Sequence, residues 1–406
     1  MTFLTRAQRL ALFAAVFGSV LLCAGQLFLW ARAFTANPLD QDFTLWYAAA
    51  RVGLTDGWNH LYDADRQEQM IRQLQHVNGA LSPLSVYISP PPLAWLAAPF
   101  TLVPPTPAYL VWTAISVVAL VGAWRLVAPR PVKWPWLYAL PLLAWFPVFI
   151  GLVLGQPVAF VMLSVAAAAW LAQRNRKFAA GVVLSLTLLK PQLALLVGPT
   201  LLFGGEMVFA SGWLTGTAVL IGLSVGLVGV VGIEHGLELV RKVQVYPYNS
   251  YLTLAYIADP VVRSGYLSPS ARLVGINPLT LSLQVVAGVS ALAIAFHNRG
   301  RGAAIVLSIG IIGSILVAPH LHQDDLAILV VAAWLLAGTR PERVLQFWPL
   351  IVLVAGESPQ FLTPLPIEAS LVAWLLLLWR KHNSRDAAAD TKTPVGAYAA
   401  ASSRAK

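Results

Sequence analysis

Cysteine and charge are both scarce in this sequence. Its one cysteine, Cys23, can form no intramolecular disulfide and no C-x-x-C pair, which excludes a disulfide framework and a dithiol redox motif. Charged residues occupy 11% of the 406 positions, against roughly 25% in an average soluble domain. So little charge over such a length excludes an ordinary soluble globular protein and indicates an integral membrane protein.

Three common catalytic signatures are also missing. The sequence holds no glycine-rich phosphate loop, no G-x-S-x-G turn and no H-E-x-x-H motif. The net charge of +10 could suggest a nucleic-acid partner. However, the basic residues gather beside apolar runs, where they orient membrane helices. We therefore expect membrane lipids as partners and no nucleic acid, and no cofactor is indicated.

Long apolar runs are what the sequence has in abundance. Hydrophobic residues make up 58% of it, and runs of about 20 residues, enough to cross a hydrocarbon core, recur throughout. The first run has no small-residue cleavage site after it, so we interpret it as a retained anchor. The pattern predicts an all-α, polytopic transmembrane helical bundle of about 10–12 spans. The predicted spans are 10–31, 106–127, 135–151, 157–173, 208–232, 277–297, 302–318, 322–338, 344–357 and 366–380.

The placement of Lys and Arg predicts how these spans are oriented. With both termini in the cytoplasm, 18 of the 27 basic residues fall on the cytoplasmic side and eight fall outside. The remaining one, Lys190, lies within an apolar stretch. We expect a multi-pass protein of the plasma (inner) membrane whose other face meets the periplasm or the exterior.

Two apolar stretches do not fit as simple crossings. Residues 88–105 are bracketed by prolines, which predicts a short helix in the outer interface. Residues 179–205 begin at a cytoplasmic basic link and must also end inside, or every later basic cluster would lie outside. The chain should therefore turn back at Lys190-Pro191, because proline permits a break before a new helical turn. We predict a broken hairpin with Lys190 at its outward tip.

The chain is expected to form one transmembrane domain over residues 1–381. Residues 32–105 and 233–276 are too long for simple turns and are predicted as outer loops with non-cytoplasmic, interfacial helical segments. Residues 382–406 are small and polar, which predicts a disordered cytoplasmic tail.

Polar groups expected on the outer side are concentrated in a few segments. Residues 40–68 alone hold six of the 17 acidic residues. Ionisable groups at membrane depth are costly and usually face a cavity, which makes them candidates for function. The candidates are Asp42, Arg51, Gln156, Lys190, Gln192, His320, His322 and Asp325.

Several candidates have a purely structural alternative. Asp40 could cap a helix that starts near residue 43, with Asp42 in its first turn. Lys190 could extend to the lipid headgroups. His320 and His322 cannot share one helix face, so one could point inward while the other is interfacial. The His-x-His pair could bind a metal, but further ligands are not evident, and no metal site is predicted.

A carboxylate opposite a Lys/His cluster at the outer leaflet suits an inverting sugar transfer. The carboxylate can accept a proton from an attacking hydroxyl. The cations can stabilise negative charge on a departing lipid phosphate. Such a donor needs no nucleotide-binding fold, because its hydrophobic tail stays in the bilayer while its head enters the cavity.

Four segments, in order, resemble glycosyltransferase family 87, polytopic enzymes of the GT-C class. DFTLWYAAARVGLTDGWNHLYD resembles the family's opening Asp-Phe and Leu-Tyr-Asp pattern, and YISPPPLAW its Tyr-x-Pro-Pro segment. VLGQPVAFVMLSVAAAAWLAQRNRKFAAGVVLSLTLLKPQLALL resembles its Gly-Gln and Lys-Pro-Gln blocks, and APHLHQDDLAILV its Pro-x-x-His/Asp segment. The four segments are spread over residues 42–335.

This resemblance implies a GT-C-type bundle that uses a polyprenyl-phosphate sugar donor, with mannose as the expected sugar. The acceptor would be a glycolipid or another lipid-linked molecule on the non-cytoplasmic face. It implies Asp42 as the general base, Lys190 near the donor phosphate, and His322 or His320 as a partner in the site. Gln156, Gln192, Arg51 and Asp325 are lesser substrate-binding candidates.

Two other functions remain open on sequence grounds. A membrane transporter or lipid flippase without transferase activity would also carry intramembrane charges, although the paired repeats common in transporters are not seen. A noncatalytic scaffold or receptor would use the outer loops instead.

Overall fold

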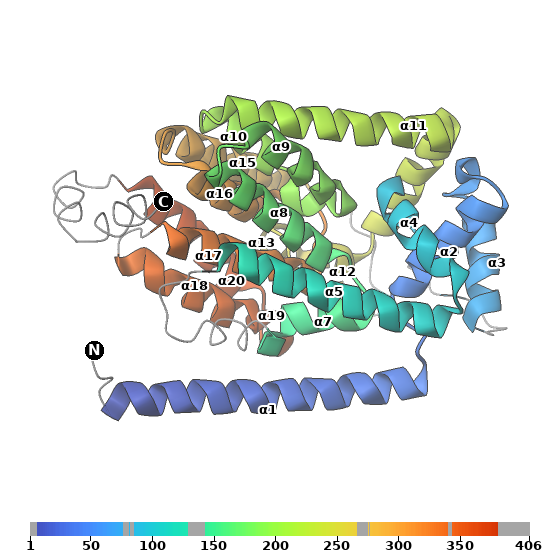
Figure 1. Cartoon of the computed structure of the whole chain (residues 1–406), viewed down its shortest axis with the longest axis horizontal. Coiled ribbons are helices and arrows are strands. Elements are labelled where there is room, and N and C mark those ends of the chain that lie inside the picture. The colour runs from blue at the N-terminus through green and yellow to red at the C-terminus, as the bar shows by residue number, and fades with distance from the viewer. Residues whose placement is uncertain are drawn as a thin grey trace, which may run out of the picture.

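The computed structural model describes residues 6–75, 81, 85–128, 143–265, 275, 277–339 and 343–380. Within these ranges all regular structure is helical (Figure 1). Four of the described helices are long and apolar enough to cross a membrane: α1 (Arg6–Ala36), α5 (Pro105–Val127), α11 (Met207–Gln244) and α15 (Pro278–His297). The prediction of an all-α polytopic membrane protein is confirmed. The predicted tail, 382–406, lies outside the described residues.

The number of helices that are long and apolar enough to cross a membrane is lower than the 10–12 spans predicted. In the described ranges it is four, or five if α7 (Phe146–Leu154) and α8 (Val158–Gln173), bent by 119°, count as one broken span. Other predicted spans are apolar helices of 10–17 residues, shorter than the about 20 residues a crossing needs. The apolar runs continue through turns that end these helices, so an apolar run in the sequence does not always correspond to one long helix. The first half of predicted span 135–151 lies outside the described residues.

Helix α1 runs along one side of the molecule (Figure 1, bottom). It has no polar stripe, and large apolar side chains such as Phe13, Phe17 and Phe28 are exposed, as expected for a helix in contact with lipid. Its second half is attached to α5, where the Trp30 indole donates to the Tyr109 hydroxyl at 2.8 Å. The Gln26 side-chain amide also donates to the Ala144 carbonyl at 2.9 Å, so the second half of α1 is fixed to the body at two described points.

The predicted outer loop 32–105 is a compact helical unit. It contains α2 (Phe43–Thr55), η1 (Trp58–His60), α3 (Ala64–Gln75), α4 (Pro91–Ala97) and η2 (Ala98–Leu102). The buried Gln67 amide ties it together, accepting from the Tyr87 backbone N–H at 2.6 Å and donating to the Leu61 carbonyl at 2.7 Å. Helices α2, α3 and α4 lie at the end of the molecule opposite the start of α1 (Figure 1).

The predicted broken hairpin is confirmed. Its first arm is α9 (Lys177–Leu184) with η4 (Ser185–Leu189), and its second is η5 (Pro191–Ala194) with α10 (Val197–Phe203). Lys190 stands between the arms in a non-helical conformation. At the open end Lys177 forms an ion pair of 2.7 Å with Glu206, so the chain returns to where it began.

Helix α11 packs against the hairpin through small residues. A Cβ added at Gly212 would lie 2.0 Å from the Phe178 carbonyl oxygen of α9, so only glycine allows this approach. Helix α11 is interrupted at Gly229 (φ 76°, ψ 162°) and then continues to Gln244. The outer segment 233–276 was predicted as a loop, but its first part is therefore helix. It continues as α12 (Pro247–Ser250), α13 (Ala255–Ala258) and α14 (Pro260–Gly265).

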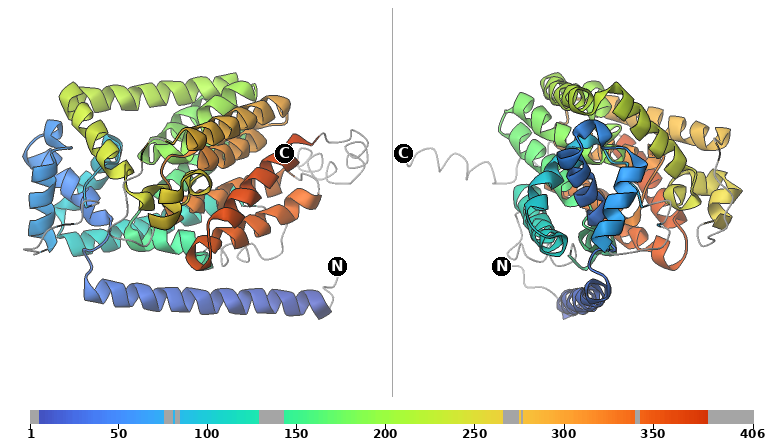
Figure 2. Two further views of the ribbon diagram at one scale, coloured as in Figure 1. Left: turned by 180° about the vertical axis from the view of Figure 1, so that it is seen from behind. Right: turned by 90° about the vertical axis from the view of Figure 1, so that its right-hand side faces the viewer.

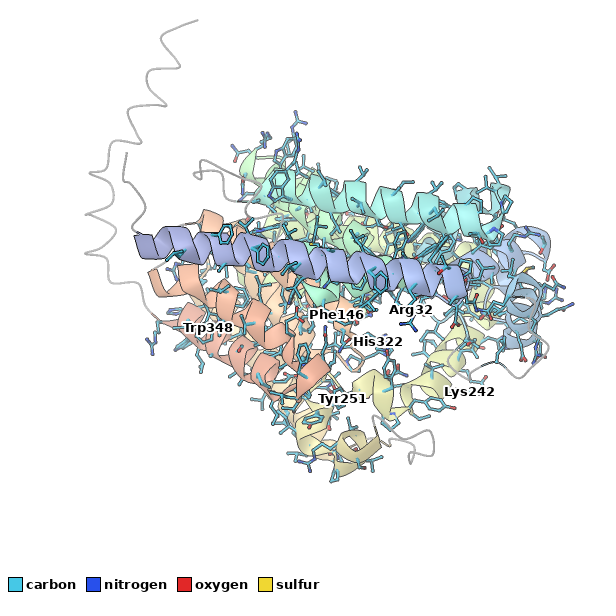
Figure 3. The ribbon with its side chains drawn as sticks, turned by 90° about the horizontal axis from the view of Figure 1, so that it is seen from below. Arg32, Phe146, Lys242, Tyr251, His322 and Trp348 are labelled. Atoms are coloured by element: carbon cyan, nitrogen blue, oxygen red, sulfur yellow. The ribbon has the colours of Figure 1, made fainter. Side chains whose placement is uncertain are left out.

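The C-terminal helices form the rest of the core. Helices α16 (Ala303–Val317) and α17 (Leu329–Gly338) are largely buried and are joined by η6 (Gln323–Ile328). Helices α18 (Arg343–Gly356), α19 (Ser358–Phe361) and α20 (Leu365–Trp379) follow (Figure 2). Glu357 accepts from the Phe146 backbone N–H at 3.1 Å, and the Trp348 indole donates to the Ser370 carbonyl at 3.1 Å (Figure 3). The first bond connects these helices to the start of α7, and the second connects α18 to α20.

Candidate functional site

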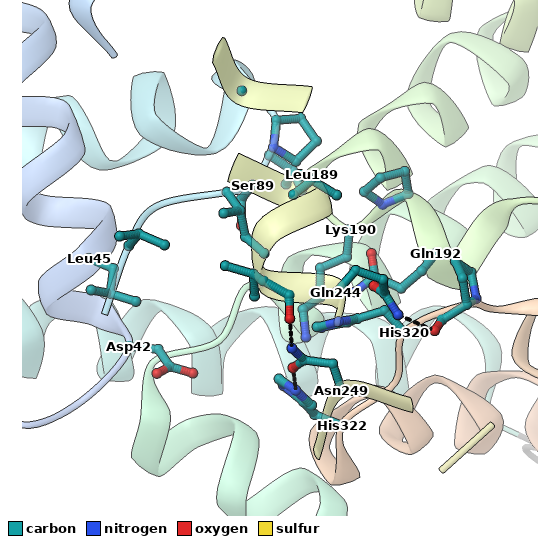
Figure 4. A pocket seen from close by; sticks show the side chains of 18 of the residues that line it. Asp42, Leu45, Ser89, Leu189, Lys190, Gln192, Gln244, Asn249, His320 and His322 are labelled. Carbon is teal, nitrogen blue, oxygen red and sulfur yellow. Dashed lines mark hydrogen bonds between the residues drawn. The ribbon is translucent and has the colours of Figure 1, made fainter. Parts of the chain in front are cut away.

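A cavity of about 650 Å³ collects most of the predicted site residues. It lies between α2, residues 86–90, the hairpin bend, the second half of α11 and the segment before η6 (Figure 4). Asp325 lies behind its wall, bound to Lys190. Arg51 is not among the lining residues, so the structure does not bring it to this site. The predicted residues that line the cavity are Asp42, Gln156, Lys190, Gln192, His320 and His322.

Asp42 occupies the N-cap position of α2, but its carboxylate does not cap the helix. Instead, it accepts a hydrogen bond of 2.5 Å from the side-chain amide of Gln156. The capping alternative considered for the Asp40/Asp42 pair thus does not account for Asp42. In Figure 4 this carboxylate stands across the cavity from Lys190, His320 and His322.

The corner between α7 and α8 holds Gln156 in place. Gly155 adopts a left-handed conformation (φ 69°), and a Cβ there would lie 2.7 Å from the Cβ of Phe43. Its carbonyl accepts from two indoles, Trp46 of α2 at 3.0 Å and Trp112 of α5 at 2.9 Å. Because three helices fix this one peptide, the neighbouring Gln156 amide meets Asp42 in a defined orientation.

Lys190 is bound by two carboxylates. Its ammonium group lies 2.5 Å from Asp324 and 2.5 Å from Asp325, and all three side chains are buried. The second oxygen of Asp325 accepts from the His322 backbone N–H at 2.9 Å, which caps η6. Asp324 was not among the predicted site residues. The Gln-Asp-Asp sequence signalled an acidic pair, but not that both members would reach one lysine.

Both histidines line the cavity, so the alternative in which one points inward and the other is interfacial does not hold. It assumed a helix, whereas residues 318–322 are non-helical, and the two imidazole centroids lie 4.5 Å apart. The pKa of His320 is lowered to about 3 by burial first and by His322 second. His320 is therefore a neutral imidazole at physiological pH.

The contact with Asn249, which lies in the segment predicted as an outer loop, determines which ring nitrogen of His322 carries the proton. The Asn249 amide nitrogen donates to the Val243 carbonyl at 2.7 Å, so its oxygen is the group that faces His322 Nε2 at 3.0 Å. This amide orientation requires Nε2 to carry the proton. His322 Nδ1 is then an acceptor. The role of Asn249 was missed, because nothing local in the sequence links it to a histidine 73 positions away.

Asp42 lies in the short link between α1 and α2, and its surroundings raise its pKa to about 6. The largest cause is burial, followed by the negative charge of Asp324, while Asp40 adds a smaller repulsion. The hydrogen bond from Gln156 and the charge of Lys190 act in the opposite direction. Such a carboxyl is mostly ionised at pH 7 and accepts a proton more readily than an ordinary aspartate, which suits a general base.

The cavity wall is largely apolar apart from these groups. Leu45, Leu189, Leu195 and several side chains of α11 supply hydrocarbon surface. Among the residues that the structure describes, no group of three or more His, Cys, Asp or Glu side chains is arranged to hold a metal ion. The arrangement can thus place a polar headgroup between Asp42 and Lys190 with an apolar chain beside it.

Comparison with known proteins gives one match. The sequence model of glycosyltransferase family 87 matches residues 87–319, which is more than half of the 406 residues. Gln156, Lys190 and Gln192 fall within the match, whereas Asp42 and His322 lie outside it. No curated protein and no solved structure matches the chain.

Proposed function

Since the chain belongs to glycosyltransferase family 87, and is therefore a glycosyltransferase, we propose that it transfers mannose from a polyprenyl-phosphate donor to a lipid-linked acceptor. Asp42 is the general base. The observation that carries this proposal is the convergence of Asp42, Lys190 and two histidines on one cavity with apolar walls. The family match does not reach Asp42, so its role rests on this geometry and on the resemblance of its own segment.

The reaction is a single displacement at the anomeric carbon. The acceptor hydroxyl gives its proton to the Asp42 carboxylate while its oxygen bonds to that carbon. The bond from the carbon to the phosphate oxygen breaks, and its electron pair leaves with the polyprenyl phosphate. Attack from the side opposite the leaving group inverts the anomeric configuration, and this requires base and phosphate on opposite sides of the sugar.

Lys190 is suited to the phosphate even though it is paired. An ammonium group has three N–H donors, and the two carboxylates use two of them. The third is available for a phosphate oxygen. His320, as a neutral imidazole, can add a hydrogen bond. His322 presents an acceptor nitrogen, which suits a sugar hydroxyl better than a phosphate oxygen.

The lipid character of both substrates agrees with the surroundings of the cavity. Leu237 and Val240 of α11 line the cavity and are partly exposed on the surface of the helix. A polyprenyl chain can therefore lie along α11 while the sugar phosphate enters. We propose a GT-C-type arrangement in the plasma membrane, with both termini cytoplasmic and the cavity facing the periplasm or exterior.

Transfer of labelled mannose in proteoliposomes tests the proposal. The purified protein is supplied with polyprenyl-phosphate mannose and a membrane lipid extract, and labelled glycolipid is measured. Asp42→Asn should lower the rate roughly 10²–10⁴-fold, as loss of a general base does. Asp65→Asn is the matched control, since Asp65 is exposed, does not line the cavity and does not act on Asp42. Equal rates in the two variants would remove Asp42 as the base. Movement of labelled lipid between leaflets without transfer would favour a flippase.

A further inference from the structure

Asp324 and Asp325 are neighbours that share Lys190 but differ in their other contacts. One oxygen of each accepts from the ammonium group at 2.5 Å. The second oxygen of Asp325 is occupied by the His322 backbone N–H. The second oxygen of Asp324, Oδ1, is buried without a hydrogen-bond partner in the described part of the chain. A buried carboxylate oxygen without a donor is costly in a folded protein.

The packing of η6 on α7 brings Asp324 toward Asp42. A Cβ built at Gly151 of α7 would lie 3.3 Å from the Cβ of Asp324. The Gly151 carbonyl accepts from the Gln156 backbone N–H at 2.8 Å, and the Gln156 side chain holds Asp42. The turn of chain from Gly151 to Gln156 thus contacts Asp324 at one end and Asp42 at the other. The side-chain amide oxygen of Gln156 is also buried without a donor, so this region is rich in acceptors.

The charges that act on Asp42 come from three places. They are Asp324 on η6, Lys190 at the hairpin bend and Asp40 in the same link, and Asp324 is the strongest of the three. Asp325 is equally buried and equally close to Lys190 but is not among the groups that act on Asp42. The difference between the two aspartates is therefore one of position, not of charge or burial.

We propose that Asp324 is a positioning residue that acts on the reaction through Asp42: its negative charge favours the protonated form of Asp42 and so helps that carboxylate take the acceptor's proton. Asp325 acts on His322 and Lys190 instead. Lys190 compensates only one of the two charges, and the uncompensated charge remains on the side that faces α7. The inference rests on the proposed role of Asp42 as the base.

The test compares two isosteric variants, Asp324→Asn and Asp325→Asn, in proteoliposomes. Infrared difference spectra taken across a pH series follow protonation of Asp42, whose carboxyl band is assigned by its loss in Asp42→Asn. The pH profile of kcat/KM for mannose transfer is measured on the same samples as the infrared spectra. Asp324→Asn should lower the midpoint of both titrations by about one pH unit, the size expected for removal of a nearby like charge. Asp325→Asn should leave the midpoint close to that of the unmodified protein and raise KM.

Two results would overturn the inference. One is a midpoint that does not move in folded Asp324→Asn, and the other is an equal shift in Asp325→Asn. If Asp324→Asn does not fold, Asp324→Ser removes the same charge and takes its place. A shift of a full pH unit in the Asp42 midpoint of Asp325→Asn would by itself refute the inference. The infrared midpoint does not depend on activity. A midpoint that shifts in Asp324→Asn, together with full transfer by Asp42→Asn, would therefore overturn the proposed function and leave the coupling standing.

Discussion

Replacing Gln156 by leucine should make Asp42 harder to ionise, because it removes the hydrogen bond that stabilises the ionised carboxylate. A hydrogen bond to a charged group is worth about 1.5–3 kcal/mol, which corresponds to roughly 1–2 pH units. The pKa of Asp42 would then rise from about 6 to between about 7 and 8. At pH 7 its ionised fraction would fall from about nine-tenths to between about a half and a tenth.

The assay is the pH profile of kcat/KM for mannose transfer in proteoliposomes. We expect Gln156→Leu to be about 2- to 10-fold slower than the unmodified protein at pH 7 and to recover toward its rate at pH 9, once Asp42 is ionised again. Gln360→Leu, which removes an amide on α19 away from the cavity, is the control and should keep the original profile. The shift is opposite in sign to that expected for loss of the charge at Asp324.

The reasoning is refuted if the Gln156→Leu profile keeps its midpoint while the rate falls equally at every pH. Gln156 would then contribute to binding or folding, and not to the ionisation of Asp42. A thermal unfolding curve of Gln156→Leu distinguishes a role in folding from a role in binding. A role in folding lowers the unfolding temperature, whereas the midpoint of the pH profile stays where it was.

Three further predictions concern stability and are checked by thermal unfolding in detergent. Gly155→Ala should destabilise the protein by at least about 1–2 kcal/mol, the cost of a left-handed alanine, and an unchanged unfolding temperature would contradict the tight corner. Lys190→Met leaves two buried carboxylates unpaired and should cost about 3–5 kcal/mol. Lys242→Met, whose ion pair with Glu238 on α11 is exposed, is the control and should cost little; equal losses would argue against the buried triad. Gly212→Leu should separate α9 from α11 and lower the unfolding temperature, while Gly222→Leu, on an open part of the same helix, should not.

Features governed by simple physical constraints could be predicted from the sequence. The helical membrane class follows from apolar length. The hairpin follows from the basic link before it, from the orientation that the later basic clusters require, and from Lys190-Pro191 in the middle. Asp42 became a candidate because it lies in an acidic segment after the first apolar run and because the resemblance to glycosyltransferase family 87 implies it as the base. The structure then places it against Gln156, 114 positions away.

The remaining features depend on contacts that local patterns do not encode. The two histidines were not expected to line the same cavity, because a helix was assumed over residues that are non-helical. Asp324 and Asp325 are adjacent residues of the same type. The packing of Asp324 against Gly151 and the hydrogen bond from the His322 backbone N–H to Asp325 distinguish them. The length of α11 was underestimated because its second half is more polar than a membrane span, yet it stays helical and forms a wall of the cavity.

The most direct test of the central claim is a structure of the protein with a polyprenyl-phosphonate mannose analogue that cannot be cleaved. Our account predicts the phosphonate within hydrogen-bond distance of the Lys190 ammonium group, with the anomeric carbon between it and Asp42. An analogue bound with its phosphonate away from Lys190, or with Asp42 on the same side of the sugar as the phosphonate, would contradict it.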